Sequence, residues 1–136
     1  MPGISDESRR AAPDRVEPLH SAESPPEFPE LGPSYCAEDP DGVETWRVIV
    51  ESVRPAGLRL QPFVSQITWA ALTGLRVPTL VVGGGADLLV PAPLTESAAS
   101  RLPRARYVNV PGADHAIAWE RPGPVDAALL ELLRAA

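Results

Sequence analysis

The chain has 136 residues and a formal net charge of −6 at pH 7, which suits one modest domain and no more. Residues 1–45 hold eleven of the eighteen acidic residues but only three arginines, so this part repels phosphate and nucleic acid is not expected as a partner. No run of about 18 apolar residues could span a membrane, and no secretory signal is recognisable, so we expect a cytoplasmic protein without membrane association.

The first predicted segment is rich in proline and acid. Residues 1–40 contain eight of the seventeen prolines and few large apolar side chains, too few to offset the entropy cost of ordering. We therefore predict a disordered segment over residues 1–40, with Phe28, Leu31 and Tyr35 as its contact points. The lone Cys36 cannot form an internal disulfide, and no neighbouring histidine suggests a nucleophile.

A short helical segment is predicted next, over residues 41–74. Asp41 can cap a helix that Pro55 stops, and its apolar positions recur at steps of three and four. A second helix is predicted over Phe63–Leu72, ended by Gly74. In this helical layer, we expect Trp46 and Trp69 to lie in the core.

The pattern over residues 75–136 predicts an α/β fold. An apolar, β-branched run and an alternating run indicate strands, and amphipathic segments indicate a helix after each strand. In chain order these are a strand at 79–82, a helix at 94–102, a strand at 105–110 and a helix at 125–133. This order predicts two parallel strands joined by a right-handed crossover.

Two parallel strands alone leave an unpaired sheet edge. The sequence therefore resembles the terminal portion of a larger α/β fold, because nothing upstream is a convincing strand. The open edge predicts self-association or pairing with a complementing polypeptide.

Two chemically active side chains follow the predicted strands. Asp87 comes after the first strand and His115 after the second. Parallel strands deliver their following loops to the same sheet edge, so the two side chains are expected to meet. The carboxylate would then orient an imidazole that acts as general base. The alternatives are an Asx-turn for Asp87 and, for His115, an N-cap or a loop histidine bonded to backbone.

The segments "LRVPTLVVGGGADLLVP" and "VPGADHAIAWERPGPVDAALLELL" resemble the acid strand and the histidine loop with last helix of the α/β-hydrolase superfamily. The matching positions are Gly112, His115, Glu120 and Pro122, and the order of acid before histidine also agrees. The resemblance is good over residues 75–133, and residues 41–75 more weakly resemble the helical cap of that family. The fold expected is thus the C-terminal part of an α/β-hydrolase fold.

The resemblance implies site roles. Asp87 would be the triad acid, His115 the general base, and Glu120 a structural residue of the loop. Asp114 stands where many relatives have glycine, and its side chain either raises the basicity of His115 or, as we expect, faces solvent. A metal site built from Asp87, Asp114 and His115 matches no strong ligand pattern, and neither metal nor cofactor is expected.

The nucleophile of the family is not recognisable. It sits on a G-x-S-x-G elbow between strand and helix, and no such pattern occurs in these 136 residues. Ser34, Ser52, Ser65 and Ser97 are not predicted at a turn of that kind. We therefore expect a hydrolase of ester or related bonds that is inactive alone and acts on a small-molecule substrate if a nucleophile is supplied. The alternative is a non-catalytic remnant or a protein-interaction module.

Overall fold

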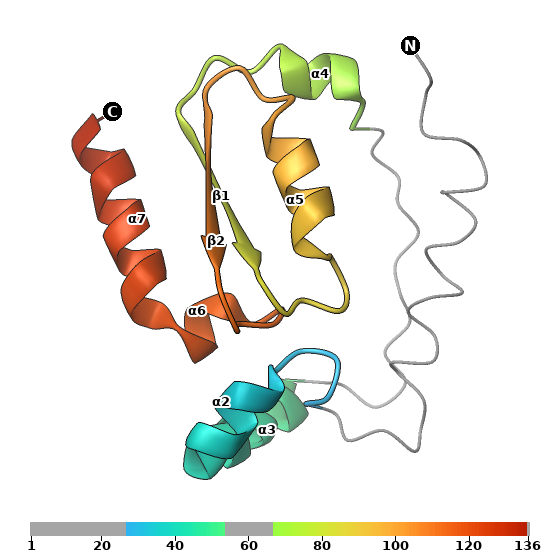
Figure 1. Cartoon of the computed structure of the whole chain (residues 1–136), viewed down its shortest axis with the longest axis vertical. Coiled ribbons are helices and arrows are strands. Elements are labelled where there is room, and N and C mark those ends of the chain that lie inside the picture. The colour runs from blue at the N-terminus through green and yellow to red at the C-terminus, as the bar shows by residue number, and fades with distance from the viewer. Residues whose placement is uncertain (1–26, 54–66, 136) are drawn as a thin grey trace.

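The computed structural model describes residues 27–53 and 67–135 (Figure 1). The elements in chain order are α2 (Pro33–Glu38), α3 (Pro40–Val53), α4 (Trp69–Thr73), β1 (Thr79–Gly84), α5 (Ala92–Ala99), β2 (Ala105–Val110), α6 (Ile117–Glu120) and α7 (Pro122–Ala135). None of the helices in these two ranges is long and apolar enough to cross a bilayer.

A parallel two-stranded sheet carries the C-terminal part of the chain. The register runs from Thr79 opposite Ala105 to Gly84 opposite Val110, and α5 and α7 flank the two strands (Figure 1). Within the described ranges these are the two strands of the sheet. The predicted α/β architecture with parallel strands and flanking helices is confirmed, and β1 is two residues longer than predicted because it continues through Gly84.

The loops that follow the two strands are bonded to each other. The Gly85 amide donates to the Val110 carbonyl at 2.9 Å, and the Ala86 amide donates to the Ala113 carbonyl at 2.9 Å. A Cβ at Gly84 would lie 2.3 Å from the Asp114 carbonyl oxygen, so only glycine permits this close approach. Gly112 begins the second loop with a φ of 74°, a conformation that favours glycine.

The segment before α3 is ordered from residue 27, which corrects the prediction of disorder up to residue 40. Leu31 and Tyr35 are buried with Val43 and Trp46 in one cluster. Leu31 from the turn before α2 and Tyr35 from α2 pack against Val43 and Trp46 of α3, so the turn and the two helices bring these apolar side chains together. Residues 1–26 lie outside the described ranges.

The start of α3 also differs from the prediction. The helix begins at Pro40, and the Gly42 amide donates to Asp39 Oδ1 at 2.9 Å. Asp39, not Asp41, therefore supplies the capping carboxylate. Proline is favoured in a first helical turn because it has no amide hydrogen to leave unpaired. By the same rule α7 begins at Pro122, three residues before the predicted start at residue 125.

Trp69 is 38% exposed, which corrects its assignment to the core. The guanidinium carbon of Arg101 lies 4.5 Å from the centre of its ring, so the aromatic face is covered by a cation. The helix that carries it, α4, begins at Trp69 after Thr68, whose Oγ1 accepts from the Ala71 amide at 3.2 Å. Gly74 follows the helix as predicted, whereas Phe63 lies outside the described residues.

The tight contact at Gly84 predicts a large effect of a single methyl group. Gly84→Ala should lower the free energy of unfolding by about 2–3 kcal/mol, because backbone atoms of the histidine loop must move. Gly123→Ala is the matched control, because a Cβ there meets nothing within 4 Å, and it should leave stability unchanged or raise it by about 0.5 kcal/mol. Urea unfolding followed by tryptophan fluorescence measures both, and equal effects would contradict the packing described.

Candidate active site

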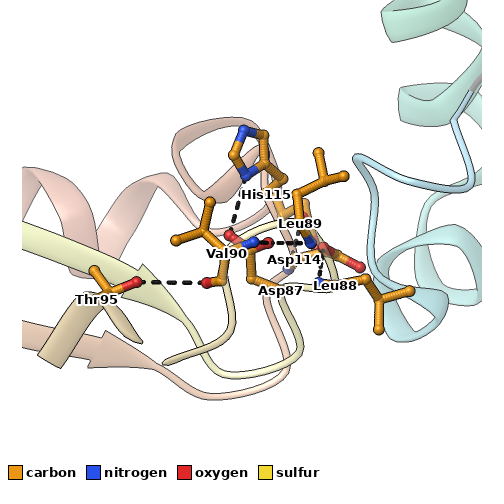
Figure 2. Close-up of polar contacts among 8 residues, drawn as sticks. Asp87, Leu88, Leu89, Val90, Thr95, Asp114 and His115 are labelled. Carbon is orange, nitrogen blue, oxygen red and sulfur yellow. Dashed lines mark hydrogen bonds and ion pairs between the residues drawn. The ribbon is translucent and has the colours of Figure 1, made fainter. Parts of the chain in front are cut away.

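The Asp87 and His115 side chains meet beyond the carboxyl ends of the strands. His115 Nδ1 lies 3.0 Å from Asp87 Oδ2 (Figure 2). Asp87 is three residues past β1 and His115 five residues past β2. The parallel pairing of the strands brings the two loops to one edge, as the sequence predicted.

The second oxygen of Asp87 fixes the carboxylate. Oδ1 accepts from the amides of Leu89 at 2.8 Å and Val90 at 2.7 Å, and the side chain is 5% exposed. The Asx-turn that the sequence offered as an alternative is therefore present together with the histidine contact. One carboxylate serves both, because each of its oxygens has its own partner.

The contact sets the orientation of the imidazole. An ionised carboxylate only accepts hydrogen bonds, so Nδ1 carries the proton and Nε2 of the neutral ring is the basic nitrogen. The His115 side chain is 42% exposed. The imidazole therefore remains accessible while its partner is buried.

Asp114 is buried, which corrects the expectation that it faces solvent. It is 1% exposed, and its Oδ1 accepts from the Leu88 amide at 3.1 Å. Burial raises the pKa of this carboxyl, and the nearby Asp87 adds to the rise, against the hydrogen bond from Leu88. Asp114, which directly precedes His115, thus holds the acid loop by its hydrogen bond from the Leu88 amide. The sequence signal that could have indicated a role for Asp114 in the site was its position directly before the histidine.

Glu120 joins three segments at the base of the site. It is 3% exposed. Its Oε1 accepts from the Asp114 amide at 2.9 Å and its Oε2 from the Gly32 amide at 3.2 Å. Burial raises its pKa, while these two backbone hydrogen bonds lower it. This geometry agrees with a structural role for Glu120, and no sequence signal indicated Gly32 as its partner.

Other chemistries find less support in the geometry. Among the residues that the structure describes, no group of three or more His, Cys, Asp or Glu side chains is placed to hold a metal ion. Ser34, Ser52 and Ser97 lie in α2, α3 and α5, not at a turn between a strand and a helix. Ser65 falls outside the described ranges.

Comparison with known proteins identifies the family. A family model described as "Alpha/beta hydrolase family" matches residues 1–128. The chain belongs to the α/β hydrolase family. Over 61 residues it is 36% identical to the "Putative non-heme bromoperoxidase BpoC" of Mycobacterium tuberculosis, a match that covers 45% of this chain and 23% of that protein.

Solved structures of α/β hydrolases resemble most of the chain. A thermophilic esterase from Thermogutta terrifontis is similar over 98% of this chain and 52% of its own, with a TM-score of 0.65 and 26% identity. BpoC from M. tuberculosis is similar over 97% of this chain and 54% of its own, with a TM-score of 0.64 and 20% identity. This α/β hydrolase chain therefore spans about half the length of these two relatives.

Replacement of Glu120 should loosen the loop that carries His115. Glu120→Gln keeps one acceptor but places an amide group against a backbone amide, so it should lower the free energy of unfolding by about 1–3 kcal/mol. Glu131→Gln is the control: that residue is 57% exposed and paired with Arg106, and its loss should cost less than about 0.5 kcal/mol. Urea unfolding compares the two, and equal small effects would show that the Glu120 contacts contribute little.

The raised pKa of Asp114 predicts a pH-dependent stability. Because the folded state binds this proton more tightly, the stabilisation is complete below the unfolded pKa of about 3.9 and is lost as pH rises through the folded pKa. Asp114→Asn keeps an Oδ1 acceptor without the charge. Its free energy of unfolding minus that of the wild type should therefore rise with pH above about pH 4. Urea unfolding at a series of pH values tests this, and a constant difference would contradict it.

Proposed function

We propose that Asp87 and His115 are the acid and the base of a hydrolase triad that cleaves an ester or related bond in a small-molecule substrate. The observation that carries this proposal is the 3.0 Å contact from His115 Nδ1 to Asp87 Oδ2, with the imidazole half-exposed. A buried, oriented carboxylate beside an accessible imidazole suits proton transfer.

The proposed chemistry assigns each nitrogen of the imidazole one task. Nε2 takes the hydroxyl proton of a nucleophile while the oxygen attacks the substrate carbonyl carbon. Asp87 stabilises the imidazolium through Nδ1. The imidazolium then gives its proton to the leaving alkoxide. Water next attacks the carbonyl carbon bound to the nucleophile, with Nε2 again taking a proton and returning it to the nucleophile oxygen, so that the acid is released and the nucleophile is restored. An aspartate nucleophile is the variant in which His115 activates only the water.

The nucleophile must come from residues other than the described serines. We infer that it is carried by another polypeptide segment, which would also supply the donors for the oxyanion. Two features favour such a segment: the sheet has unpaired edges within the described ranges, and the related structures have about twice the aligned length. Without that segment, the 136 residues should show little or no turnover.

The surface beside the imidazole is apolar. A pocket of about 340 Å³ adjoins His115 and is lined otherwise by Val82, Ala116, Ile117, Ala118, Trp119 and Val125. Such a surface favours an uncharged acyl or alkyl group next to the base, or the apolar side chains of the segment that brings the nucleophile.

A chimera tests the proposal. The part of the T. terrifontis esterase that this chain leaves uncovered would be joined to the 136 residues, and hydrolysis of p-nitrophenyl esters of several chain lengths would be measured. The chimera should be active. His115→Ala and Asp87→Asn should each lower kcat by about a thousandfold to ten-thousandfold, because the base or its tautomer is lost.

His20→Ala is the matched control, because His20 is the other histidine of the chain, and it should retain activity. A folded chimera without activity on any ester, or one indifferent to His115→Ala, would overturn the assignment and favour a non-catalytic interaction module. Turnover by the 136 residues alone that His115→Ala abolishes would instead overturn the inferred need for a second segment.

A further inference from the structure

A second pocket lies on the acid loop next to the catalytic pair. It has a volume of about 680 Å³, and segment 27–37 forms one wall while Ala86, Leu88 and Asp114 contribute the other. This volume is within the range of small-molecule sites, about 300–1,000 Å³. Leu88 and Asp114 are sequence neighbours of Asp87 and His115, yet neither Asp87 nor His115 lines it.

Two unsatisfied carboxylate oxygens belong to residues that line this pocket. Among the described residues, Glu27 Oε2 and Asp114 Oδ2 are the buried side-chain atoms without a hydrogen-bond partner, and both residues line the same pocket. A buried polar atom without a partner costs free energy. Carboxylate oxygens accept hydrogen bonds, so the missing partner is a donor.

The charges around the pocket leave one carboxylate without a cation. Glu27 Oε1 accepts from Arg47 Nη2 at 2.7 Å, and this pairing lowers the pKa of Glu27. Asp114 has no such arginine partner among the described residues: its Oδ1 accepts from the neutral Leu88 amide, and a backbone hydrogen bond from His115 also lowers its pKa. The Cys36 thiol also lines the pocket, and burial together with Glu27, Glu120 and Asp114 raises its pKa. It contacts the Leu31 carbonyl, so it does not satisfy the two carboxylates.

Apart from Cys36, the other described residues of the lining are apolar. Phe28, Leu31 and Leu88 are its largest apolar members, and Phe28 and Leu88 are 49% and 50% exposed. A matching ligand therefore joins a positively charged donor to an apolar body. Two carboxylates alone are too few oxygens for Ca²⁺, which takes six to eight, so an organic cation fits better than a metal ion.

We propose that this pocket binds a primary ammonium group carried on an apolar chain or ring, with the ammonium at Asp114 and Glu27. Its hydrogens would bond to the two unsatisfied oxygens after small side-chain adjustments, and its apolar body would cover Phe28 and Leu88. Binding here requires no chemistry at His115, so it is independent of the hydrolase proposal.

The test uses the full 136-residue chain and three probes of equal length: hexylammonium, hexan-1-ol and hexanoate. Titration followed by NMR amide shifts should place hexylammonium at Ala86 and Leu88, with an affinity about tenfold or more above that of hexan-1-ol. Hexanoate should not bind. Equal affinity for the alcohol, or shifts that map elsewhere, would overturn the proposal.

Variants separate the charge from the shape of the pocket. Asp114→Asn should lower the affinity for hexylammonium about tenfold or more and leave that for hexan-1-ol unchanged. Ala37→Phe, which fills the pocket from the exposed side of α2, should abolish binding of both. Asp126→Asn on α7 is the control and should bind as the wild type does. If Asp114→Asn does not fold, Ala37→Phe and the comparison of the three probes test the proposal instead. An affinity for hexylammonium that is unchanged in Ala37→Phe would overturn it.

Discussion

The site depends on two buried carboxylates that satisfy backbone amides. The Asp114 carboxylate accepts from the Leu88 amide, and the Glu120 carboxylate accepts from the amides of Asp114 and Gly32. These bonds tie together the acid loop, the histidine loop and the N-terminal helices. Buried charges are costly, as the raised pKa values of both groups show, and hydrogen bonds from backbone amides offset that cost.

The arrangement divides the work among neighbouring residues. Asp87 contacts His115, while the residue after Asp87 and the residue before His115 make a second contact between the loops: the Leu88 amide donates to the Asp114 carboxylate. Glycine at position 84 lets the backbone of the histidine loop approach the end of β1. The 3.0 Å contact between Asp87 and His115 is thus supported by short backbone contacts between the two loops, and such support fixes the positions of side chains carried on loops.

The chain is a member of the α/β hydrolase family, and the assignment of Asp87 and His115 to a triad is our proposal from their contact. The chain covers 52% of the T. terrifontis esterase and 54% of BpoC, and in these 136 residues the nucleophile elbow is not recognisable. The apolar surface lies beside His115 and the acidic pocket lies beside Asp114, the residue that precedes His115 in the same loop. One loop system therefore presents two surfaces of different chemistry, and the proposed hydrolysis concerns only the first.

The sequence by itself determined the two strands, their parallel pairing, the flanking helices and the meeting of Asp87 with His115. Those features follow from local patterns and from the rule that parallel strands send their loops to one edge. Only the tertiary structure decided the burial of Asp114, the contact of Glu120 with Gly32, the ordering of residues 27–40 and the exposure of Trp69. Each of these depends on which distant surface covers a residue. Gly32 and Glu120 are 88 positions apart, and no local pattern records that they touch.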